Sequence, residues 1–228
     1  SLNKLAEATR QNTLAQIIGI TGSVGKTTLK NLIAHILKNY GNVYYSPHSY
    51  NNKYGVPLSI SNLKKNTDYG IFEIGMDKKG EILKLSKIAR PEIAIITNIS
   101  AAHFKNFNTL KDIAKAKSEI IDNITKDGTL ILNKDNKFFN FLKNKAKKKG
   151  IKVISYSSKK RSNIFLLKVK KKNKKYRLKI SVNDKIFYFN TKIYTKSLAS
   201  NILACIATIN VLALNLKKIE KKFLDFQI

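Results

Sequence analysis

The sequence predicts an α/β fold in which a doubly wound, mostly parallel sheet is followed by an antiparallel β meander and late helices. Three observations support this fold class. Short apolar runs, typical of buried strands, alternate with helical patterns up to about residue 156. A glycine-rich loop separates the first apolar run from the first helical pattern. From residue 164 onward, segments that alternate apolar and polar residues replace this rhythm, as half-buried antiparallel strands do.

Strands are assigned to apolar runs bounded by turn formers, and helices to apolar residues that recur every three or four positions. Residues 1–16 are expected to form a short linker helix, and residues 17–228 to form the domain. In the parallel core, 17–156, strands are predicted at 17–20, 43–45, 69–74, 93–96, 130–132 and 153–155, and helices at 29–37, 58–63, 80–88, 109–124 and 138–149. In 157–228, strands at 164–171, 176–182 and 186–194 are expected to pack on the edge of the main sheet, followed by helices at 197–214 and 217–224.

The composition indicates a folded protein of a reducing compartment. Hydrophobic residues make up 43% of the 228 residues, and there are three prolines. The one cysteine, Cys205, excludes an internal disulfide framework, and its apolar neighbours predict a buried, inert thiol. Residues 1–16 have no apolar signal segment, and no run approaches the length of a membrane span. We therefore expect a cytoplasmic location without membrane insertion.

The formal charge of +30, from 44 Lys and Arg against 14 Asp and Glu, raises the question of a nucleic-acid partner. The cations are nearly all lysines spread along the chain, while arginine occurs only at Arg10, Arg90, Arg161 and Arg177. Arginine is the residue suited to bidentate base and phosphate contacts, and no nucleic-acid-binding motif is present. We expect no specific nucleic-acid partner, only salt-sensitive attraction to polyanions. The basic stretch 168–175 is expected to be a solvated hairpin tip.

The stretch Ile17–Thr28, IIGITGSVGKTT, has the strand, glycine loop, Lys-Thr and helix order of a phosphate-binding P-loop. Glycines let successive backbone N–H groups turn toward an anion, and the helix N-terminus adds its positive end. In this interpretation Lys26 neutralises the β- and γ-phosphates and the Thr27 hydroxyl binds Mg²⁺. The strict GxxxxGK[ST] spacing fails because position 20 is Ile. The stretch nevertheless predicts a nucleotide site.

Further polar residues follow strands of the predicted sheet. Glu73 ends an apolar strand, the loop 97–103 with His103 follows the next, and Asn133 and Asp135 follow a third. Because the carboxyl ends of parallel strands share one edge, a single ligand could meet all of them together with the P-loop. Glu73 is either a Mg²⁺ ligand beside Thr27 or a solvated charge at a strand end. The 133–135 segment is either a ligand contact or an ordinary turn.

Lys117 shares the apolar face of the predicted helix 109–124 with Ile113, Ile120 and Ile121. The side chain is therefore directed toward the core, where a free ammonium is costly. The alternative is that its stem is buried while the amine reaches solvent. Lys115 is the neighbour that is easily mistaken for it.

Six motifs, ITGSVGKTT, NNKYGVP, EIGMDKKGEI, ARPEIAIITNISAAH, AKAKSEI and LNKDN, occur in the order and spacing of the Mur ligases. From about Leu5 onward the chain resembles the central ATPase domain of this family. The combination is most similar to the branch that adds D-alanyl-D-alanine to UDP-N-acetylmuramoyl-tripeptide, a step of peptidoglycan synthesis. The family's UDP-sugar-binding and amino-acid-binding domains, which flank the central domain, are expected to be absent from these 228 residues.

The resemblance implies a ligase that transfers the γ-phosphoryl group of ATP to a carboxylate, after which an amine attacks the acyl phosphate. It implies ATP and Mg²⁺ as cofactors, a carbamylated Lys117, and a monomer. The implied catalytic residues are Lys26, His103 and Lys117, and the implied metal ligands are Thr27, Glu73, His103 and Lys117. The implied nucleotide contacts are Thr21, Gly22, Ser23, Val24, Gly25, Lys26, Thr27, Thr28, Asn133, Asp135 and Asn201, and the implied substrate contacts are Asn51 and Asn52.

The chain departs from the family pattern at three places. The Gly-Asn pair that precedes the two asparagines is His48-Ser49 here, and Asn136 takes the last place of the NxDD motif. The HNxxN motif, which helps to bind adenine in the family, keeps only Asn201, with Ser197 and Leu198 at the other two positions. These departures leave open the alternative of a P-loop module that binds ATP without ligase activity.

Overall fold

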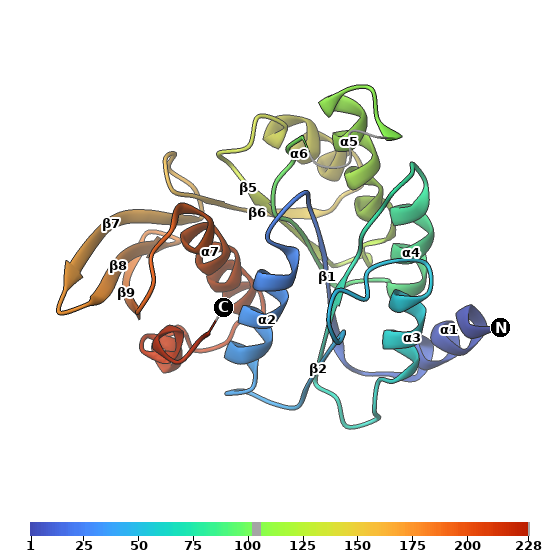
Figure 1. The fold of residues 1–228 in the computed structure, drawn as a ribbon, viewed down its shortest axis with the longest axis horizontal. Coiled ribbons are helices and arrows are strands. Elements are labelled where there is room, and N and C mark those ends of the chain that lie inside the picture. Colours follow the sequence, from blue (N-terminus) through green and yellow to red (C-terminus); the bar gives the residue numbers. More distant parts are fainter. Residues whose placement is uncertain (102–105, 228) are drawn as a thin grey trace.

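The computed structural model describes residues 1–101 and 106–227. Within them, one nine-stranded sheet has the order β2-β3-β1-β4-β5-β6-β7-β8-β9 (Figure 1). Neighbouring strands from β2 to β7 are parallel, whereas β7, β8 and β9 are antiparallel. The strands are β1 (Gln16–Thr21), β2 (Val43–Tyr45), β3 (Tyr69–Glu73), β4 (Ile93–Ile96), β5 (Thr129–Asn133), β6 (Lys152–Ser157), β7 (Ile164–Lys172), β8 (Lys175–Val182) and β9 (Lys185–Thr191).

Helices cover both faces of the parallel part of the sheet, so its strands are apolar on both sides. Figure 1 shows α2 and α7 on one side and α1, α3 and α4 on the other. The α-helices are α1 (Leu2–Asn12), α2 (Lys26–Leu37), α3 (Gly55–Ser61), α4 (Glu81–Ala89), α5 (Leu110–Lys117), α6 (Phe139–Lys148) and α7 (Lys196–Val211). Three 3₁₀ segments complete the described chain, η2 (Ser118–Asn123), η3 (Leu216–Ile219) and η4 (Lys222–Leu224). None of the described helices is long and apolar enough to cross a bilayer.

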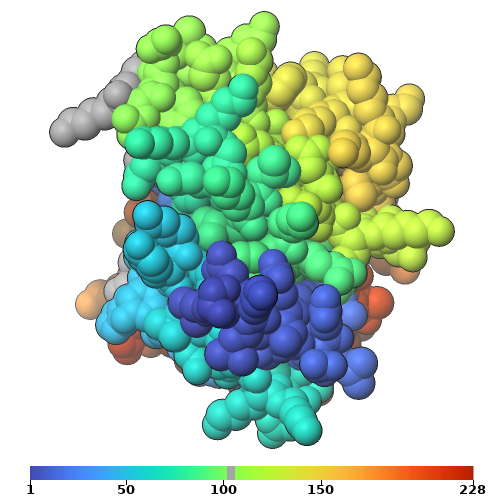
Figure 2. Space-filling view, turned by 90° about the vertical axis from the view of Figure 1, so that its right-hand side faces the viewer, coloured from blue at the N-terminus to red at the C-terminus, as the bar shows by residue number. Residues whose placement is uncertain are grey.

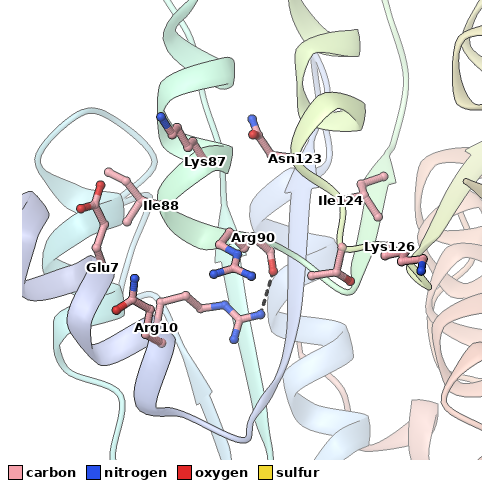
Figure 3. A pocket seen from close by; sticks show the side chains of 10 residues that line it. Glu7, Arg10, Lys87, Ile88, Arg90, Asn123, Ile124 and Lys126 are labelled. Carbon is pink, nitrogen blue, oxygen red and sulfur yellow. Dashed lines mark hydrogen bonds between the residues drawn. The ribbon is translucent and has the colours of Figure 1, made fainter. Parts of the chain in front are cut away.

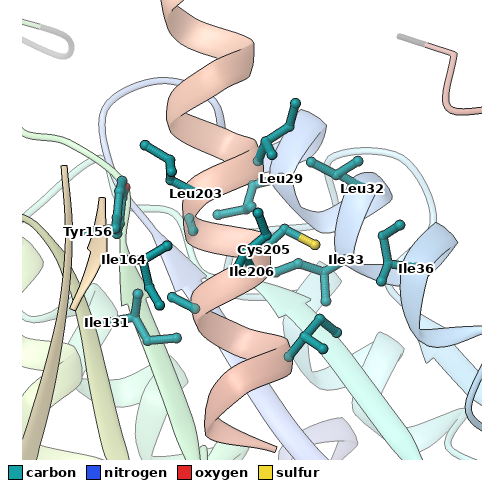
Figure 4. Packing of buried hydrophobic residues seen from close by; sticks show 14 of the residues in the cluster. Leu29, Leu32, Ile33, Ile36, Ile131, Tyr156, Ile164, Leu203, Cys205 and Ile206 are labelled. Carbon is teal, nitrogen blue, oxygen red and sulfur yellow. The ribbon is translucent and has the colours of Figure 1, made fainter. Parts of the chain in front are cut away.

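Alternate residues of each central strand enter two separate cores. In β1, Ile18 and Ile20 join the core under α2 and α7, whereas Ile17 joins the core under α1 and α3 to α6. In the first core, apolar side chains of α2 and α7 meet each other above the strands (Figure 4). Cys205 is completely buried there, and burial raises the pKa of its thiol, which confirms the predicted inert cysteine.

The meander extends the main sheet by hydrogen bonding. Strand β7 pairs in parallel with β6 at Tyr156–Ile164 and Ser157–Phe165 before it turns into the antiparallel part. Both hairpin turns, at residues 173–174 and 183–184, have two successive residues with positive φ, which suits the twist of a two-residue turn. The predicted fold class, a mostly parallel sheet with a C-terminal antiparallel meander and late helices, is confirmed.

Most predicted helices have different bounds in the structure. The helix expected from 58 begins at Gly55, because the Asn52 side chain accepts hydrogen bonds from the N–H groups of Tyr54 and Gly55. The helix expected over 109–124 changes to a 3₁₀ segment after Lys117, where the Ser118 hydroxyl donates to the Lys115 carbonyl. The last predicted helix consists of the 3₁₀ segments η3 and η4.

Helix α1 is fastened to the core by Arg10. Figure 2 shows α1, in dark blue, seated against the blue-green segments that contain α3 and α4. Arg10 is buried and donates to the carbonyl oxygens of Ala89 and Arg90, each at 2.7 Å, and to Glu92. Glu92 also accepts from the Ile17 N–H at 2.7 Å, so the pair joins α1 to the beginning of β1.

Arg10→Ala is expected to lower the free energy of unfolding by about 2–4 kcal/mol, because it leaves buried carbonyl groups and a carboxylate without their donor. Urea unfolding at neutral pH measures the change. Arg161→Ala is the matched control, since its pair with Asp184 is exposed on both sides and is worth less than about 1 kcal/mol. Equal effects of the two substitutions would contradict the structural role of Arg10.

Candidate functional site

The P-loop connects β1 to α2 and requires glycine at two positions. Gly22 has φ +149°, and a Cβ there would lie 1.9 Å from the Thr97 hydroxyl oxygen. Gly25, in the left-handed region at φ +84°, is the N-cap of α2, and a Cβ there would come within 3.2 Å of Asn201 Oδ1. The N-cap residue Gly25 has no side chain that could cap α2, so among the described residues the N–H groups of its first turn remain available for an anion.

The loop that follows β4 braces the P-loop. The Ser23 N–H donates to the Asn98 carbonyl at 3.0 Å, and the Val24 N–H donates to Asn98 Oδ1 at 3.1 Å. The Thr97 hydroxyl donates to the Val24 carbonyl at 2.8 Å, and the Ser23 hydroxyl donates to the Ser100 carbonyl at 3.0 Å. The loop conformation is therefore fixed by the protein itself. The sequence indicates where the loop after β4 lies but not that it holds the P-loop in shape.

Lys26 and Thr27 begin α2 and reach toward β3. The Lys26 ammonium donates back to the Gly22 carbonyl at 3.0 Å; burial lowers its pKa, while nearby Glu73 acts in the opposite direction. The Thr27 hydroxyl donates to Glu73 Oε2 at 3.2 Å and lies 3.3 Å from the Ser49 hydroxyl. Glu73 is completely buried, so the structure excludes the alternative of a solvated charge at the end of β3. Thr21 is also buried, and Thr28 is half-buried in the same helical turn as Thr27.

The surroundings of Glu73 fit a Mg²⁺ ion bound together with phosphate. Its Oε1 is buried and lies 3.2 Å from the Lys30 ammonium, but it accepts no hydrogen bond of good geometry from the described residues. The described residues contain no group of three His, Cys, Asp or Glu that would form an all-protein metal site. Mg²⁺ is commonly held by one or two carboxylates, with phosphate and water oxygens as its other ligands. His103, the predicted second ligand residue, lies outside the described residues.

Lys117, the last residue of α5, is directed into the core as predicted. Its exposed fraction is 1%. Burial, together with repulsion from the Lys26 ammonium, lowers the pKa of Lys117 to about 7. Lys115, by contrast, is exposed and lies 3.9 Å from Asp112. The structure therefore distinguishes the two lysines and places an amine with a low pKa beside the P-loop lysine.

A cavity of about 380 Å³ opens beside Lys26 and contains both predicted substrate contacts, Asn51 and Asn52. The Asn51 carbonyl accepts from the Gly75 N–H at 2.7 Å, which fastens this loop to the end of β3. Asn52 begins α3 with its side-chain oxygen, as described above. The cavity is also lined by Lys53, Tyr54, Gly75, Met76, Asp77, Lys78, Glu81 and Leu85.

A second cavity of about 400 Å³ contains Asn133 and Asp135, the predicted nucleotide contacts after β5. Asn133 Oδ1 accepts from the Asp135 N–H at 2.9 Å. This bond forms a local turn, which is one of the two alternatives that the sequence allows for residues 133–135. The Asp135 carboxylate accepts hydrogen bonds from Ser157 and Ser158. Asn201, which α7 carries, lies against Gly25 of the P-loop.

The two departures from the adenine motif lie at the start of α7. Leu198 is buried in the core and its N–H donates to the Thr195 hydroxyl, the N-cap of this helix. Ser197 lies in the first turn of the same helix. Leu198 therefore serves packing.

A third cavity lies at the opposite edge of the sheet. It has a volume of about 590 Å³ and is lined by residues of α1 and α4 and of the segment before β5, including Arg10, Lys87, Arg90 and Lys126 (Figure 3). These residues precede β1, β4 and β5, whereas the predicted site residues follow strands. The predicted site residues thus lie away from this cavity.

Lys30 belongs to the site but was not singled out from the sequence. It is 1% exposed, and its ammonium lies 3.2 Å from Glu73 Oε1. It donates to the Ser46 carbonyl at 2.6 Å and to the His48 carbonyl. The available signal was its position four residues after Lys26, on the same face of α2. His35, in contrast, contacts the Lys222 carbonyl at 3.0 Å, consistent with a structural role.

A P-loop, a buried acid and a buried lysine at the carboxyl edge of a doubly wound sheet define a nucleotide-binding α/β domain. The family model of the Mur ligase middle domain matches residues 20–209 of this sequence. The chain therefore belongs to this family.

Two curated relatives are UDP-N-acetylmuramoyl-tripeptide–D-alanyl-D-alanine ligases. The one from Buchnera aphidicola (subsp. Acyrthosiphon pisum) is 35% identical over 99% of this chain and 50% of its own length. The one from Rickettsia prowazekii is 33% identical over 98% and 50%. The chain thus spans about half the length of these relatives.

Solved structures agree with this assignment. MurF from Acinetobacter baumannii matches with a TM-score of 0.91 and 26% identity, over 100% of this chain and 49% of that one. The MurF ligase from Thermotoga maritima in complex with ADP matches with a TM-score of 0.89 and 25% identity, over 100% and 52%.

Proposed function

We propose that this chain is the ATP-binding domain of a ligase that adds D-alanyl-D-alanine to UDP-N-acetylmuramoyl-tripeptide during peptidoglycan precursor synthesis. The observation that carries the proposal is the gathering of Lys26, Glu73 and Lys117 at one end of the sheet, beside the cavity of Asn51 and Asn52. The names of the relatives support the substrate pair. The protein is proposed to act in the cytoplasm as a monomer.

In this proposal the first-turn N–H groups of α2 bind the phosphates of ATP, and Lys26 neutralises the charge on the β- and γ-phosphates. Thr27 and Glu73 would hold Mg²⁺, which neutralises further charge on the phosphate oxygens when it is bound. Asn51 and Asn52 would face the substrate carboxylate. That carboxylate attacks the γ-phosphorus and ADP leaves; the amine of D-alanyl-D-alanine then attacks the acyl carbon and phosphate leaves.

Lys117 is proposed to be carbamylated. Its pKa of about 7 supports this, because a large share of the amine is uncharged at neutral pH and only the uncharged amine forms a bond to the carbon of CO₂. The reaction releases a proton and replaces a buried cation by an anion. Such an anion beside Lys26 would remove the repulsion between the two lysines and provide oxygen ligands for a metal.

Two measurements on the 228 residues and on a protein that contains them test the proposal. Titration calorimetry is expected to show that the 228 residues bind Mg·ATP. Phosphate release that depends on both tripeptide and D-alanyl-D-alanine is expected only from a protein of the length of the relatives. Binding of Mg·ATP without such phosphate release in the longer protein would support the alternative, a P-loop module without ligase activity. Absence of nucleotide binding would contradict both functions.

A further inference from the structure

We propose that Lys30 is a positioning residue that couples the Mg²⁺ site to the loop carrying Asn51 and Asn52. The inference rests on the proposed function, because it assigns Lys30 to the Mg·nucleotide site described above. It concerns neither the P-loop lysine nor a metal ligand. One buried ammonium holds both the acidic side chain and the backbone of the loop.

The three contacts of Lys30 join three separate elements. Lys30 lies on α2, Glu73 ends β3, and the carbonyl groups of Ser46 and His48 belong to the loop after β2. The ammonium donates hydrogen bonds to the two carbonyl groups, and with Glu73 it forms an ion pair at 3.2 Å. Lys30 and Glu73 are 1% and 0% exposed, which separates this pair from the surface lysines of the chain.

Packing alone does not explain a lysine at this position. Burying two opposite charges costs several kcal/mol of solvation per ion, and well-packed apolar residues of similar volume commonly serve stability as well or better. Removing only the lysine, however, would leave the buried Glu73 carboxylate without its ion-pair partner. A residue that is poor for packing but complementary to Glu73 is best explained by the need to keep that carboxylate in place.

The loop after β2 is also held by Lys30. His48 has φ +46°, a left-handed conformation that is unfavourable for a residue with a Cβ and that costs on the order of 1 kcal/mol. Lys30 donates to the His48 carbonyl, and the next residue, Ser49, places its hydroxyl 3.3 Å from Thr27. The turn therefore returns the chain to the P-loop just before Asn51 and Asn52.

Lys26 and Lys30, one helical turn apart, therefore have different roles in the proposed site. Lys26 and the P-loop N–H groups suffice for the phosphates, so nucleotide binding without metal does not need Lys30. The gain in nucleotide affinity on adding Mg²⁺ does need Lys30, because this gain depends on the positions of the Glu73 and Thr27 side chains. Loss of Lys30 is expected to remove the gain and leave the metal-free affinity.

The test compares the dissociation constant of a fluorescent ADP analogue in EDTA and in excess Mg²⁺. In Lys30→Met, the dissociation constant measured in EDTA is expected to stay within about twofold of the wild-type value. The factor by which Mg²⁺ tightens binding is expected to be about tenfold smaller than in the wild type, which is within the usual range of coupling between sites. Lys38→Met, which replaces an exposed lysine at the C-terminal end of the same helix, is the matched control and is expected to keep the whole gain. Lys30→Arg retains a cation and is expected to restore most of the gain.

The outcomes separate a failure of the role of Lys30 from a failure of the proposed function. A full Mg²⁺ gain in Lys30→Met would overturn the positioning role and leave Lys30 as a core residue. If circular dichroism shows that Lys30→Met is unfolded, Lys30→Arg carries the test, and a gain no larger than one tenth of the wild-type gain would overturn the proposal. Absence of ADP binding by the wild type in either buffer would instead contradict the proposed function.

Discussion

Lys26→Ala is expected to weaken Mg·ATP binding at least about 30-fold while the fold is retained. A charged hydrogen bond to phosphate, lost from a partly desolvated site, costs about 2–5 kcal/mol, and each 1.4 kcal/mol is a tenfold change in affinity. The fold does not need this ammonium, since the hydrogen bond seen for it goes to the Gly22 carbonyl of its own loop. Burial also lowers the pKa of Lys26, so its charge is a cost to the folded state without ligand.

Titration calorimetry measures the affinity, and thermal unfolding without nucleotide measures the fold. Lys38→Ala, at the exposed C-terminal end of the same helix, is the control for a lost positive charge. We expect the control to bind as the wild type does. Unchanged affinity in Lys26→Ala, with an unchanged melting temperature, would mean that the P-loop does not hold the phosphates.

The sequence predicts the parallel core well because the signal is local. A strand buried on both faces is a short apolar run, and an amphipathic helix shows its spacing, so β2 and β4 have the predicted bounds. The same logic directs Lys117 inward, since its neighbours at helical spacing are isoleucines. Helix bounds are less predictable, because one side-chain hydrogen bond, such as that of Asn52 or Ser118, moves the end of a helix.

The parts of the site that the sequence does not predict depend on partners far along the chain. The bracing of Val24 by Thr97 and Asn98 joins residues more than 70 positions apart, and periodicity carries no information on such pairs. Lys30 is a similar case. The sequence shows that Lys30 lies one helical turn after Lys26. A lysine on an otherwise apolar helix, however, usually reaches solvent. Only the position of Glu73 in the structure shows that Lys30 is paired in the interior.

Lys117→Met is expected to stabilise the metal-free protein, most strongly at low pH. The pKa of Lys117 is about 7 in the folded state and about 10.4 in an unfolded chain. Between these values the unfolded state binds a proton that the folded state does not, so the contribution of Lys117 to stability rises with pH. Below pH 7 both states are protonated and the whole cost of the buried ammonium remains; above about pH 10.4 it is absent.

The gain in the free energy of unfolding for Lys117→Met should therefore be about 2–4 kcal/mol at pH 6 and decrease toward zero at pH 10. Urea unfolding at pH 6, 8 and 10, in CO₂-free buffer with EDTA, measures it on the unmodified amine. Lys115→Met is the matched control, since that lysine is exposed, and its effect should stay within about 0.5 kcal/mol at every pH. A Lys117→Met effect that is constant with pH would contradict a buried, unpaired ammonium. The carbamylation proposed for Lys117 needs the low pKa that burial causes, because only the uncharged amine reacts with CO₂ and a solvated amine would remain protonated at neutral pH.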